Sequence, residues 1–154
     1  VLNGNLYRNI EWPVVVMLAA MIPVGQALET SGISSNIANF ISASTDGLAL
    51  PWLILMVLVI TMFVSDIVNN AATAVIMAPI AANLAIQAGQ PVEPFLMAVA
   101  VGASCAFLSP IGHQCNTLVM APGNYKFGDY WRLGLPLECV IVAISIPMIL
   151  FVWT

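Results

Sequence analysis

Residues 65–79 read SDIVNNAATAVIMAP and place four polar side chains, Ser65, Asp66, Asn69 and Asn70, between two apolar runs. The chain around them has 154 residues, of which 61% are hydrophobic and 6% are charged, and its mean hydropathy is +1.01. Soluble domains carry about 25% charged residues, so the composition predicts an all-α integral membrane protein in a lipid bilayer. It offers no basic stripe that would bind nucleic acid.

Apolar runs on both sides of this stretch predict the other membrane segments. Residues 12–30 have the length of a span of about 20 residues, and residues 133–153 form the last span. Residues 33–43 are too short and too polar to cross, and they predict a helix lying in the interface. Two further runs, 48–88 and 93–122, are each interrupted by polar residues.

These interruptions, at 65–70 and at 109–116 (SPIGHQCN), carry the functional information. In lipid, unpaired backbone groups cost several kcal/mol each, so broken helices occur only where they line a cavity or are buried in protein. Segment 48–88 is therefore a re-entrant hairpin with its tip at 69–70, or two full spans joined by a short loop, since its length allows both. Segment 93–122 is predicted to be a helix unwound in its middle.

Helix ends at these interruptions could bind ions. Asn70 and Asn116 each precede an apolar run and are expected to cap the following helix, whose free N–H groups attract anions. The preceding half-helices should end in free carbonyls at 64–68 and 109–112, which with the Ser65 and Asn70 side chains suit a hard cation such as Na⁺. Half-helices that offer N–H groups to an anion and carbonyls to a cation recur in secondary transporters. No organic cofactor is indicated.

Other interpretations of these residues stay open. Asp66 is an intramembrane carboxylate, which points to function by default, but it could simply satisfy the hairpin tip. His113 could contact an anion, relay a proton or fill the loop. Polar residues in membrane helices often only bond a neighbouring helix, for about 0.6 kcal/mol, and a non-transporting scaffold would need no more. A hydrolase using His113 with Ser104 or Ser109 lacks a nucleophile motif, so no enzyme is predicted.

The basic residues predict the orientation. If segment 33–43 does not cross, Arg8, Lys126 and Arg132 fall on one side, which the positive-inside rule makes cytoplasmic. We expect the plasma (inner) membrane. The first residue is not Met and residues 1–11 contain no targeting segment, so a fragment of a longer protein is expected.

SDIVNNAATAVIMAP and VGASCAFLSPIGHQCNTLVMAPGNYKFGDYWRLGLP (residues 101–136) resemble the C-terminal half of the divalent anion/sodium symporters. That family belongs to the ion-transporter superfamily of inverted repeats. The resemblance implies that residues 1–154 form one half of an inverted-repeat secondary transporter. It also implies that the N-terminal half of the same transporter is its partner, that the whole protein is a homodimer, and that transport proceeds by an elevator-like movement.

The resemblance also assigns site residues. The family's second sodium ion falls on two side chains and two backbone carbonyls, those of Ser65, Asn70, Val68 and Gly112. The substrate anion falls near the hairpin tip and the unwound loop, at Asn69, Asn70, Ala71, His113 and Asn116. Asp66 beside them is an ion or proton site.

Two departures from the family pattern bear on the substrate. The family's Ser-Asn-Thr tip reads Asn69-Asn70-Ala71 here, and His113 replaces a small hydroxyl residue. Sulfate or another small oxyanion is therefore expected as readily as a dicarboxylate. The implied function is sodium-coupled transport of a small anion. The alternative within the superfamily is an antiporter that exchanges Na⁺ for H⁺ or extrudes arsenite, with Asp66 as the proton carrier.

Overall fold

The computed structural model describes residues 30–44 and 49–153, with a few isolated helical positions between 15 and 27. Arg8 and most of the span expected over 12–30 lie outside the described residues. The described part of the chain is helical throughout its regular structure and contains no strand. Its elements are α2 (Ile33–Ser44), α3 (Leu50–Ile67), α4 (Asn70–Gln87), α5 (Glu93–Ala103), α6 (Gln114–Met120), the 3₁₀ helix η2 (Phe127–Asp129) and α7 (Tyr130–Trp153).

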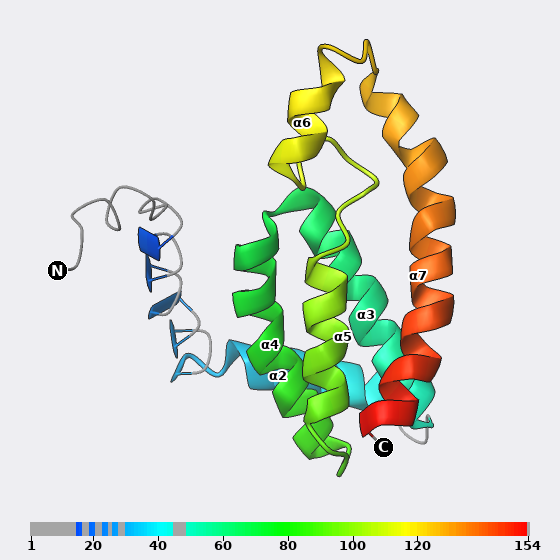
Figure 1. Cartoon of the computed structure of the whole chain (residues 1–154). Helices are drawn as coiled ribbons and strands as arrows, with labels where there is room; N and C mark the ends of the chain where they lie inside the picture. The colour runs from blue at the N-terminus through cyan, green and yellow to red at the C-terminus, as the bar shows by residue number, and fades with distance from the viewer. Residues whose placement is uncertain are drawn as a thin grey trace, which may run out of the picture.

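Helices α3, α4 and α5 form the centre of the molecule, and α7 runs beside them (Figure 1). Their shared core is hydrophobic, with Ile54 and Leu58 of α3, Leu84 of α4 and Phe95 of α5 almost completely buried. Gly102 brings α5 close to α3, because a Cβ atom at that position would lie 2.9 Å from the Leu58 carbonyl oxygen. Close helix approach through a small residue is typical of membrane bundles.

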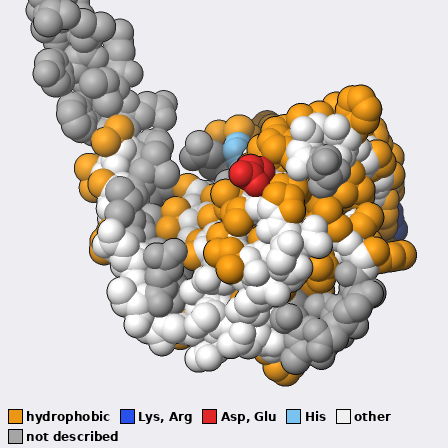
Figure 2. Space-filling model, turned by 90° about the horizontal axis from the view of Figure 1, so that it is seen from below, with side chains coloured by type: hydrophobic (Ala, Val, Ile, Leu, Met, Phe, Trp, Pro, Cys, Tyr) orange, Lys and Arg blue, Asp and Glu red, His pale blue; other side chains and the backbone are white. Residues whose placement is uncertain are grey.

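Within the described part of the chain, three helices are long and apolar enough to cross a membrane: α3, α4 and the continuous stretch Phe127–Trp153. Each of the first two has 18 residues and therefore rises about 27 Å, slightly less than the roughly 30 Å hydrocarbon core of a bilayer. Hydrophobic side chains also cover large parts of the described surface in Figure 2, where charged groups take up little area. The prediction of an all-α membrane protein agrees with these features.

Helix α2 occupies the segment expected to lie in the interface, and it packs across the lower part of α4 rather than along it (Figure 1). Ala38 is fully buried in this contact region, and the Asn83 side chain of α4 donates a hydrogen bond of 3.3 Å to the Ser34 hydroxyl. The crossing of α2 therefore fixes the end of α4 that lies away from Asn70.

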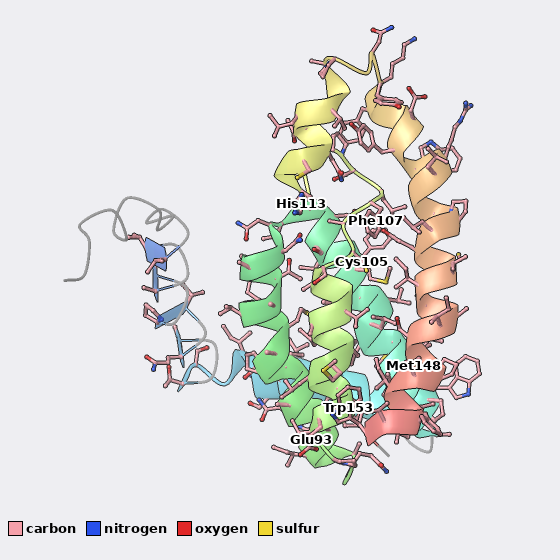
Figure 3. The ribbon with its side chains drawn as sticks, viewed as in Figure 1. Glu93, Cys105, Phe107, His113, Met148 and Trp153 are labelled. Atoms are coloured by element: carbon pink, nitrogen blue, oxygen red, sulfur yellow. The ribbon has the colours of Figure 1, made fainter. Side chains whose placement is uncertain are left out.

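Residues 104–113, here called the linker, connect α5 to α6 without helical structure. Figure 3 places Cys105 and Phe107 of the linker between the central helices and α7. Helix α7 approaches it closely at Gly134, where a Cβ atom would lie 2.4 Å from the Phe107 carbonyl oxygen. Only Gly134 and Ile149 of α7 are buried. Gly134 lies against the linker, and Ile149 packs into the core formed with α3, α4 and α5.

Candidate functional site

The turn between α3 and α4 is short, and only Val68 and Asn69 lie outside the two helices. Both residues have extended backbone conformations. The Val68 N–H still bonds the Val64 carbonyl at 2.8 Å, and the Asn69 side chain accepts from the Ala72 N–H at 2.8 Å. A backbone hydrogen bond thus caps the C-terminus of α3, and a side-chain hydrogen bond caps the N-terminus of α4.

The prediction that Asn70 caps α4 is wrong, because Asn69 is the cap. Asn69 has the extended dihedral angles of an N-cap, with φ −65° and ψ 154°, whereas Asn70 is already helical. The side chain of Asn70 is consequently free to point elsewhere. Since Asn and Ser are equally good N-caps, Asn69 keeps the capping role that a serine would have in the family's pattern.

The Asn70 side chain points into a group of oxygen atoms. One end of its amide lies 3.1 Å from the Ser65 hydroxyl and 3.2 Å from the carbonyl oxygens of Ala103 and Gly112. The Ser65 hydroxyl also donates to the Ala103 carbonyl at 2.8 Å. We call these four residues the oxygen cluster; they come from α3, α4, the end of α5 and the linker.

Gly112 reaches the oxygen cluster because it has no side chain. A Cβ atom on Gly112 would lie 2.7 Å from the Ser65 carbonyl oxygen and 2.7 Å from the Ala106 side chain. The linker backbone therefore packs directly on the last turn of α3. Ser65 itself is completely buried, so the group is shielded on the α3 side.

Several carbonyls expected to be free are already bonded. The Asp66 carbonyl accepts from the Ser109 hydroxyl at 2.6 Å, and the Val64 carbonyl accepts from Val68. In the linker, the carbonyls of Ser109 and Pro110 accept from the side chains of α6. The expectation of free carbonyls throughout 64–68 and 109–112 is thus wrong for four positions. Side chains of the linker and α6 donate to the carbonyls of Asp66, Ser109 and Pro110, and a backbone N–H donates to that of Val64.

Asp66 lies beside the oxygen cluster and forms a hydrogen bond with the linker. It is 5% exposed, and its Oδ1 atom accepts from the Leu108 N–H at 3.0 Å. Its Oδ2 atom is buried without a hydrogen-bond partner. The Thr73 hydroxyl, one turn into α4, is buried without a partner as well. Unsatisfied buried polar groups in a native protein point to strain, catalysis, or a water or ion at the site.

Asn116 also differs from its predicted role. Helix α6 begins at Gln114, and its cap is His113, whose Nδ1 accepts from the Cys115 N–H at 3.2 Å. Asn116 therefore lies inside the first turn, and its amide donates to the Ala106 carbonyl at 2.8 Å and to the Ser109 carbonyl at 3.2 Å. Its amide nitrogen holds the linker in place.

The structure therefore brings most of the predicted residues to one place. Ser65, Asn70 and Gly112 meet in the oxygen cluster, while Asn69 and Ala71 form the start of α4. His113 follows Gly112 directly, so the start of α6 lies next to the start of α4. Val68 is in the turn itself. Among the described residues, no group of His, Cys, Asp and Glu side chains could hold a metal ion, so a cation here would rely on hydroxyl, amide and carbonyl oxygens.

Three participating residues are not apparent from the sequence motifs. The Ala103 carbonyl carries no sequence signal, because any residue type has one. Ser109 is visible only as part of SPIG. Glu138 is the single charged residue within 133–153, a signal of the kind that marks function. Its Oε1 atom is buried without a hydrogen-bond partner.

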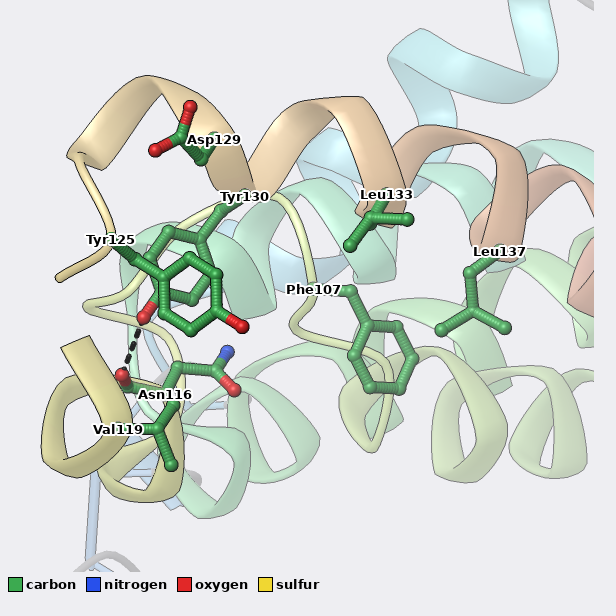
Figure 4. A pocket seen from close by; sticks show the side chains of 9 residues that line it. Phe107, Asn116, Val119, Tyr125, Asp129, Tyr130, Leu133 and Leu137 are labelled. Carbon is green, nitrogen blue, oxygen red and sulfur yellow. Dashed lines mark hydrogen bonds between the residues drawn. The ribbon is translucent and has the colours of Figure 1, made fainter. Parts of the chain in front are cut away.

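A pocket of about 210 Å³ lies beyond the oxygen cluster, between α6, η2 and the start of α7. Figure 4 shows Phe107 and Leu137 on one side of it, and the Tyr130 hydroxyl bonding to the Asn116 carbonyl. That bond is 2.7 Å long. The pocket is mostly apolar and shares the residues Phe107 and Asn116 with the contacts that hold the linker.

Long apolar helices with polar residues gathered at their facing ends are features found in membrane transporters. The chain belongs to the family described as citrate transporter, whose profile matches residues 2–102 and 49–154. This assignment confirms the resemblance to the divalent anion/sodium symporters, because relatives of the chain carry such names.

An uncharacterized transporter of Synechocystis is 38% identical over 95% of this chain and 24% of its own length. A probable sodium/sulfate cotransporter of Chlamydomonas reinhardtii is 33% identical over 94% of this chain and 16% of its own length. A sodium-dependent high-affinity dicarboxylate transporter of Caenorhabditis elegans is 31% identical over 91% of this chain and 25% of its own length. The chain thus spans about a quarter or less of these relatives.

Proposed function

We propose that this chain is the C-terminal half of a sodium-coupled symporter of a small anion. The observation that carries the proposal is the oxygen cluster, in which Ser65, Asn70, Ala103 and Gly112 converge from separate elements. Such convergence suits a hard cation, because hard cations bind hydroxyl, amide and carbonyl oxygens. Half-helix ends with exposed backbone groups provide the same ligands in other secondary transporters.

The separations in the oxygen cluster are those of hydrogen bonds to the Asn70 amide, and they are close to the spacing of oxygens around a cation of the size of Na⁺. Oxygens that share a Ca²⁺ ion, which is about as large, lie about 2.4 Å from it and therefore about 3.4 Å from one another at right angles. The Asn70 amide lies 3.1–3.2 Å from its three neighbours. With the cation bound, the amide oxygen faces inward. Without it, the amide turns its nitrogen inward and donates to the same oxygens.

The anion site would lie at the start of α4. The first N–H groups of a helix have no partner within the helix and carry partial positive charge. In α4 these belong to Asn70 and Ala71, beside the cap Asn69. His113 and Asn116 adjoin them through Gly112. Sulfate, a dicarboxylate or citrate is the substrate class, because the relatives and the family carry these names.

Helices α3 and α4 would form a re-entrant hairpin with its tip at 69–70, and α5, the linker and α6 would form the unwound helix. The missing N-terminal half of the same transporter would complete the substrate site as an inverted repeat. By family resemblance the whole protein is a homodimer in the plasma membrane, with Lys126 and Arg132 on the cytoplasmic side.

Uptake by the full-length protein in proteoliposomes tests the proposal. Labelled sulfate, succinate and citrate are offered separately with an inward Na⁺ gradient or with an equal K⁺ gradient. We expect one of these anions to be taken up only with the Na⁺ gradient. Its entry should be accompanied by entry of ²²Na⁺. Equal uptake in both gradients would refute sodium coupling, and no uptake of any anion would favour a scaffold.

Exchange of Na⁺ against H⁺, or extrusion of arsenite, is the second candidate. The unpartnered Oδ2 atom of buried Asp66 is the observation in its favour. An intramembrane carboxylate that faces the cation site could carry the exchanged proton. A pH change inside the vesicles on addition of Na⁺, without any anion present, would support exchange and exclude symport.

A further inference from the structure

The pocket between α6, η2 and the start of α7 is large enough for a hydrocarbon group. Its volume is about 210 Å³, and Phe107, Leu133 and Leu137 form much of its apolar wall. A dry apolar cavity of about 150 Å³ already binds benzene. A methylene is about as large as a water molecule, which takes about 30 Å³ in the liquid, so the pocket has room for roughly seven methylenes.

The pocket has a polar end and an apolar end. Figure 4 shows the rings of Tyr125 and Tyr130 at one end, and Phe107, Leu133 and Leu137 at the other. The two tyrosine rings pack edge to face with their centroids 6.3 Å apart. An amphipathic ligand would therefore place its polar group beside the tyrosines and its hydrocarbon part against Phe107.

The polar end is held in shape by backbone contacts. The Tyr125 N–H bonds the Met120 carbonyl at 3.0 Å, and a Cβ atom on Gly123 would lie 2.4 Å from the Tyr125 ring. The Tyr130 hydroxyl is bonded to the Asn116 carbonyl at 2.7 Å. Both tyrosines are thus placed by the fold, so the pocket is formed before any ligand binds.

The apolar end opens onto the exposed side of α7. Leu133 is 79% exposed and Leu137 is 45% exposed, and Val140 and Ile144 continue the exposed apolar surface further along the helix. From Tyr130 to Leu137 the pocket therefore runs from the polar start of α7 toward its apolar middle. A phospholipid has the same order of polar and apolar parts, and lipid chains surround a membrane-spanning helix.

Basic residues adjoin the polar end. Two of the three Lys and Arg residues of the chain, Lys126 and Arg132, flank Asp129 and Tyr130 in sequence, and both are exposed. The Asp129 carboxylate accepts from the Lys126 N–H at 2.8 Å. Two positive charges thus stand against one negative charge. Tyrosines and basic residues are typical of the headgroup level of a membrane, where Lys and Arg attract anionic lipids.

We propose that this pocket binds the acyl chain of an anionic phospholipid. The headgroup lies beside Lys126 and Arg132, and the chain passes the tyrosines and runs along Leu133 to Leu137. This inference goes beyond the proposed function and does not depend on transport. The bound chain contacts Phe107, so the lipid also covers the outer side of the linker.

The test uses the full-length transporter in vesicles that contain phosphatidylglycerol with a photoreactive diazirine in its acyl chain. After illumination, labelled residues are located by mass spectrometry of peptides covering 116–137. Leu133→Trp fills the pocket, and we expect labelling of the pocket residues to fall about tenfold, which corresponds to about 1.4 kcal/mol of binding. The control is Leu135→Trp, at an exposed α7 residue outside the pocket lining, which should leave the labelling unchanged.

Equal labelling of the wild type and Leu133→Trp would overturn the proposal. Equal loss in both tryptophan variants would overturn it too, because the lipid would then contact only the outer surface of α7. Without any labelling in the wild type, another part of the transporter or a second copy must cover the pocket, and the proposal fails. If Leu133→Trp does not insert, Val119→Phe fills the same pocket.

A second probe tests the choice of an anionic lipid. Phosphatidylcholine with the same photoreactive chain should label the pocket residues of the wild type more weakly than phosphatidylglycerol. Lys126→Gln keeps the backbone N–H that bonds Asp129 and should lower this preference about fivefold, the effect of one basic residue near an anionic surface. Equal labelling of the wild type by the two lipids would show that the headgroup charge is not recognised.

Discussion

Gly134 of α7 and Phe107 of the linker are in backbone contact, since a Cβ atom at Gly134 would lie 2.4 Å from the Phe107 carbonyl oxygen. The next nearest atoms are also backbone, the Phe107 carbonyl carbon and the Leu108 nitrogen. No side-chain rotation can relieve such a contact, so any larger residue at 134 must move α7 or the linker. A substitution at position 134 therefore tests whether the contact between α7 and the linker affects the proposed cation site.

Gly134→Ala should lower sodium-coupled uptake roughly tenfold, because overpacking costs about 1–3 kcal/mol and tenfold in rate corresponds to about 1.4 kcal/mol. Initial uptake rates and the amount of folded protein are measured together. The matched control is Gly128→Ala, since a Cβ atom there would meet nothing within 4 Å. Equal rates in the two variants would contradict close contact between α7 and the linker.

Asn70→Ala should abolish sodium-dependent uptake while leaving the protein folded. Asn69 provides the cap of α4, so removal of the Asn70 amide takes away an oxygen of the cluster without uncapping the helix. Uptake and ²²Na⁺ binding are the measurements. Sodium activation like that of the wild type in Asn70→Ala would remove the oxygen cluster from consideration as the cation site.

Asn69→Ala, in contrast to Asn70→Ala, should lower the thermal stability of the protein. Loss of an N-cap costs about 1 kcal/mol, so the variant should unfold at a lower temperature in detergent, and Asn69→Ser should restore the wild-type value because serine caps equally well. The measurement is a thermal unfolding curve of the purified full-length transporter. If Asn69→Ser were as unstable as Asn69→Ala, capping would not be the role of this side chain.

Gly112→Ala should eliminate sodium binding while the transporter stays folded. Its Cβ atom would lie 2.7 Å from the Ser65 carbonyl oxygen, which forces the linker away from α3 and carries the Gly112 carbonyl out of the oxygen cluster. The expected result is loss of measurable ²²Na⁺ binding in a protein that still elutes as a single species from gel filtration. Retained binding at wild-type affinity would show that the Gly112 carbonyl is no ligand.

Asp66→Asn separates symport from exchange. The amide oxygen can still accept from the Leu108 N–H, so the linker should keep its place while the charge is lost. In the symport mechanism the variant retains anion uptake with a weaker apparent Na⁺ affinity, measured from initial rates against Na⁺ concentration at two pH values. Complete loss of sodium-coupled flux, together with a wild-type pH dependence that follows one proton, would instead identify Asp66 as a proton carrier.

Patterns in the sequence predicted the apolar helices among the described residues and the proximity of several candidate site residues. Apolar runs broken at 65–70 and 109–116 predict membrane-length helices with polar interruptions, because hydrophobic length and backbone satisfaction in lipid are read directly from composition. Ser65, Asn70 and Gly112 are predicted as one group and lie together in the structure, although their role as sodium ligands stays a prediction.

The caps and the bonding of the linker could not be predicted, because they depend on the dihedral angles of single residues and on contacts distant in sequence. Both Asn69 and Asn70 are good cap residues, and only the backbone decides which one is outside the helix. The bond between Asp66 and Leu108 joins residues 42 positions apart. Every residue has a backbone carbonyl oxygen, so the sequence does not indicate that the one of Ala103 belongs to the oxygen cluster.

The exposed thiol of Cys115 lies two residues after the His113 cap and three after Gly112, at the start of α6. This thiol is therefore a natural labelling position close to the proposed cation site. Cys105 is buried, and Cys139 can be replaced, so a fluorescent maleimide on a transporter whose other accessible cysteines are removed would label this position. Changes in its emission during a Na⁺ titration would follow site occupancy in real time, independently of radioactive flux.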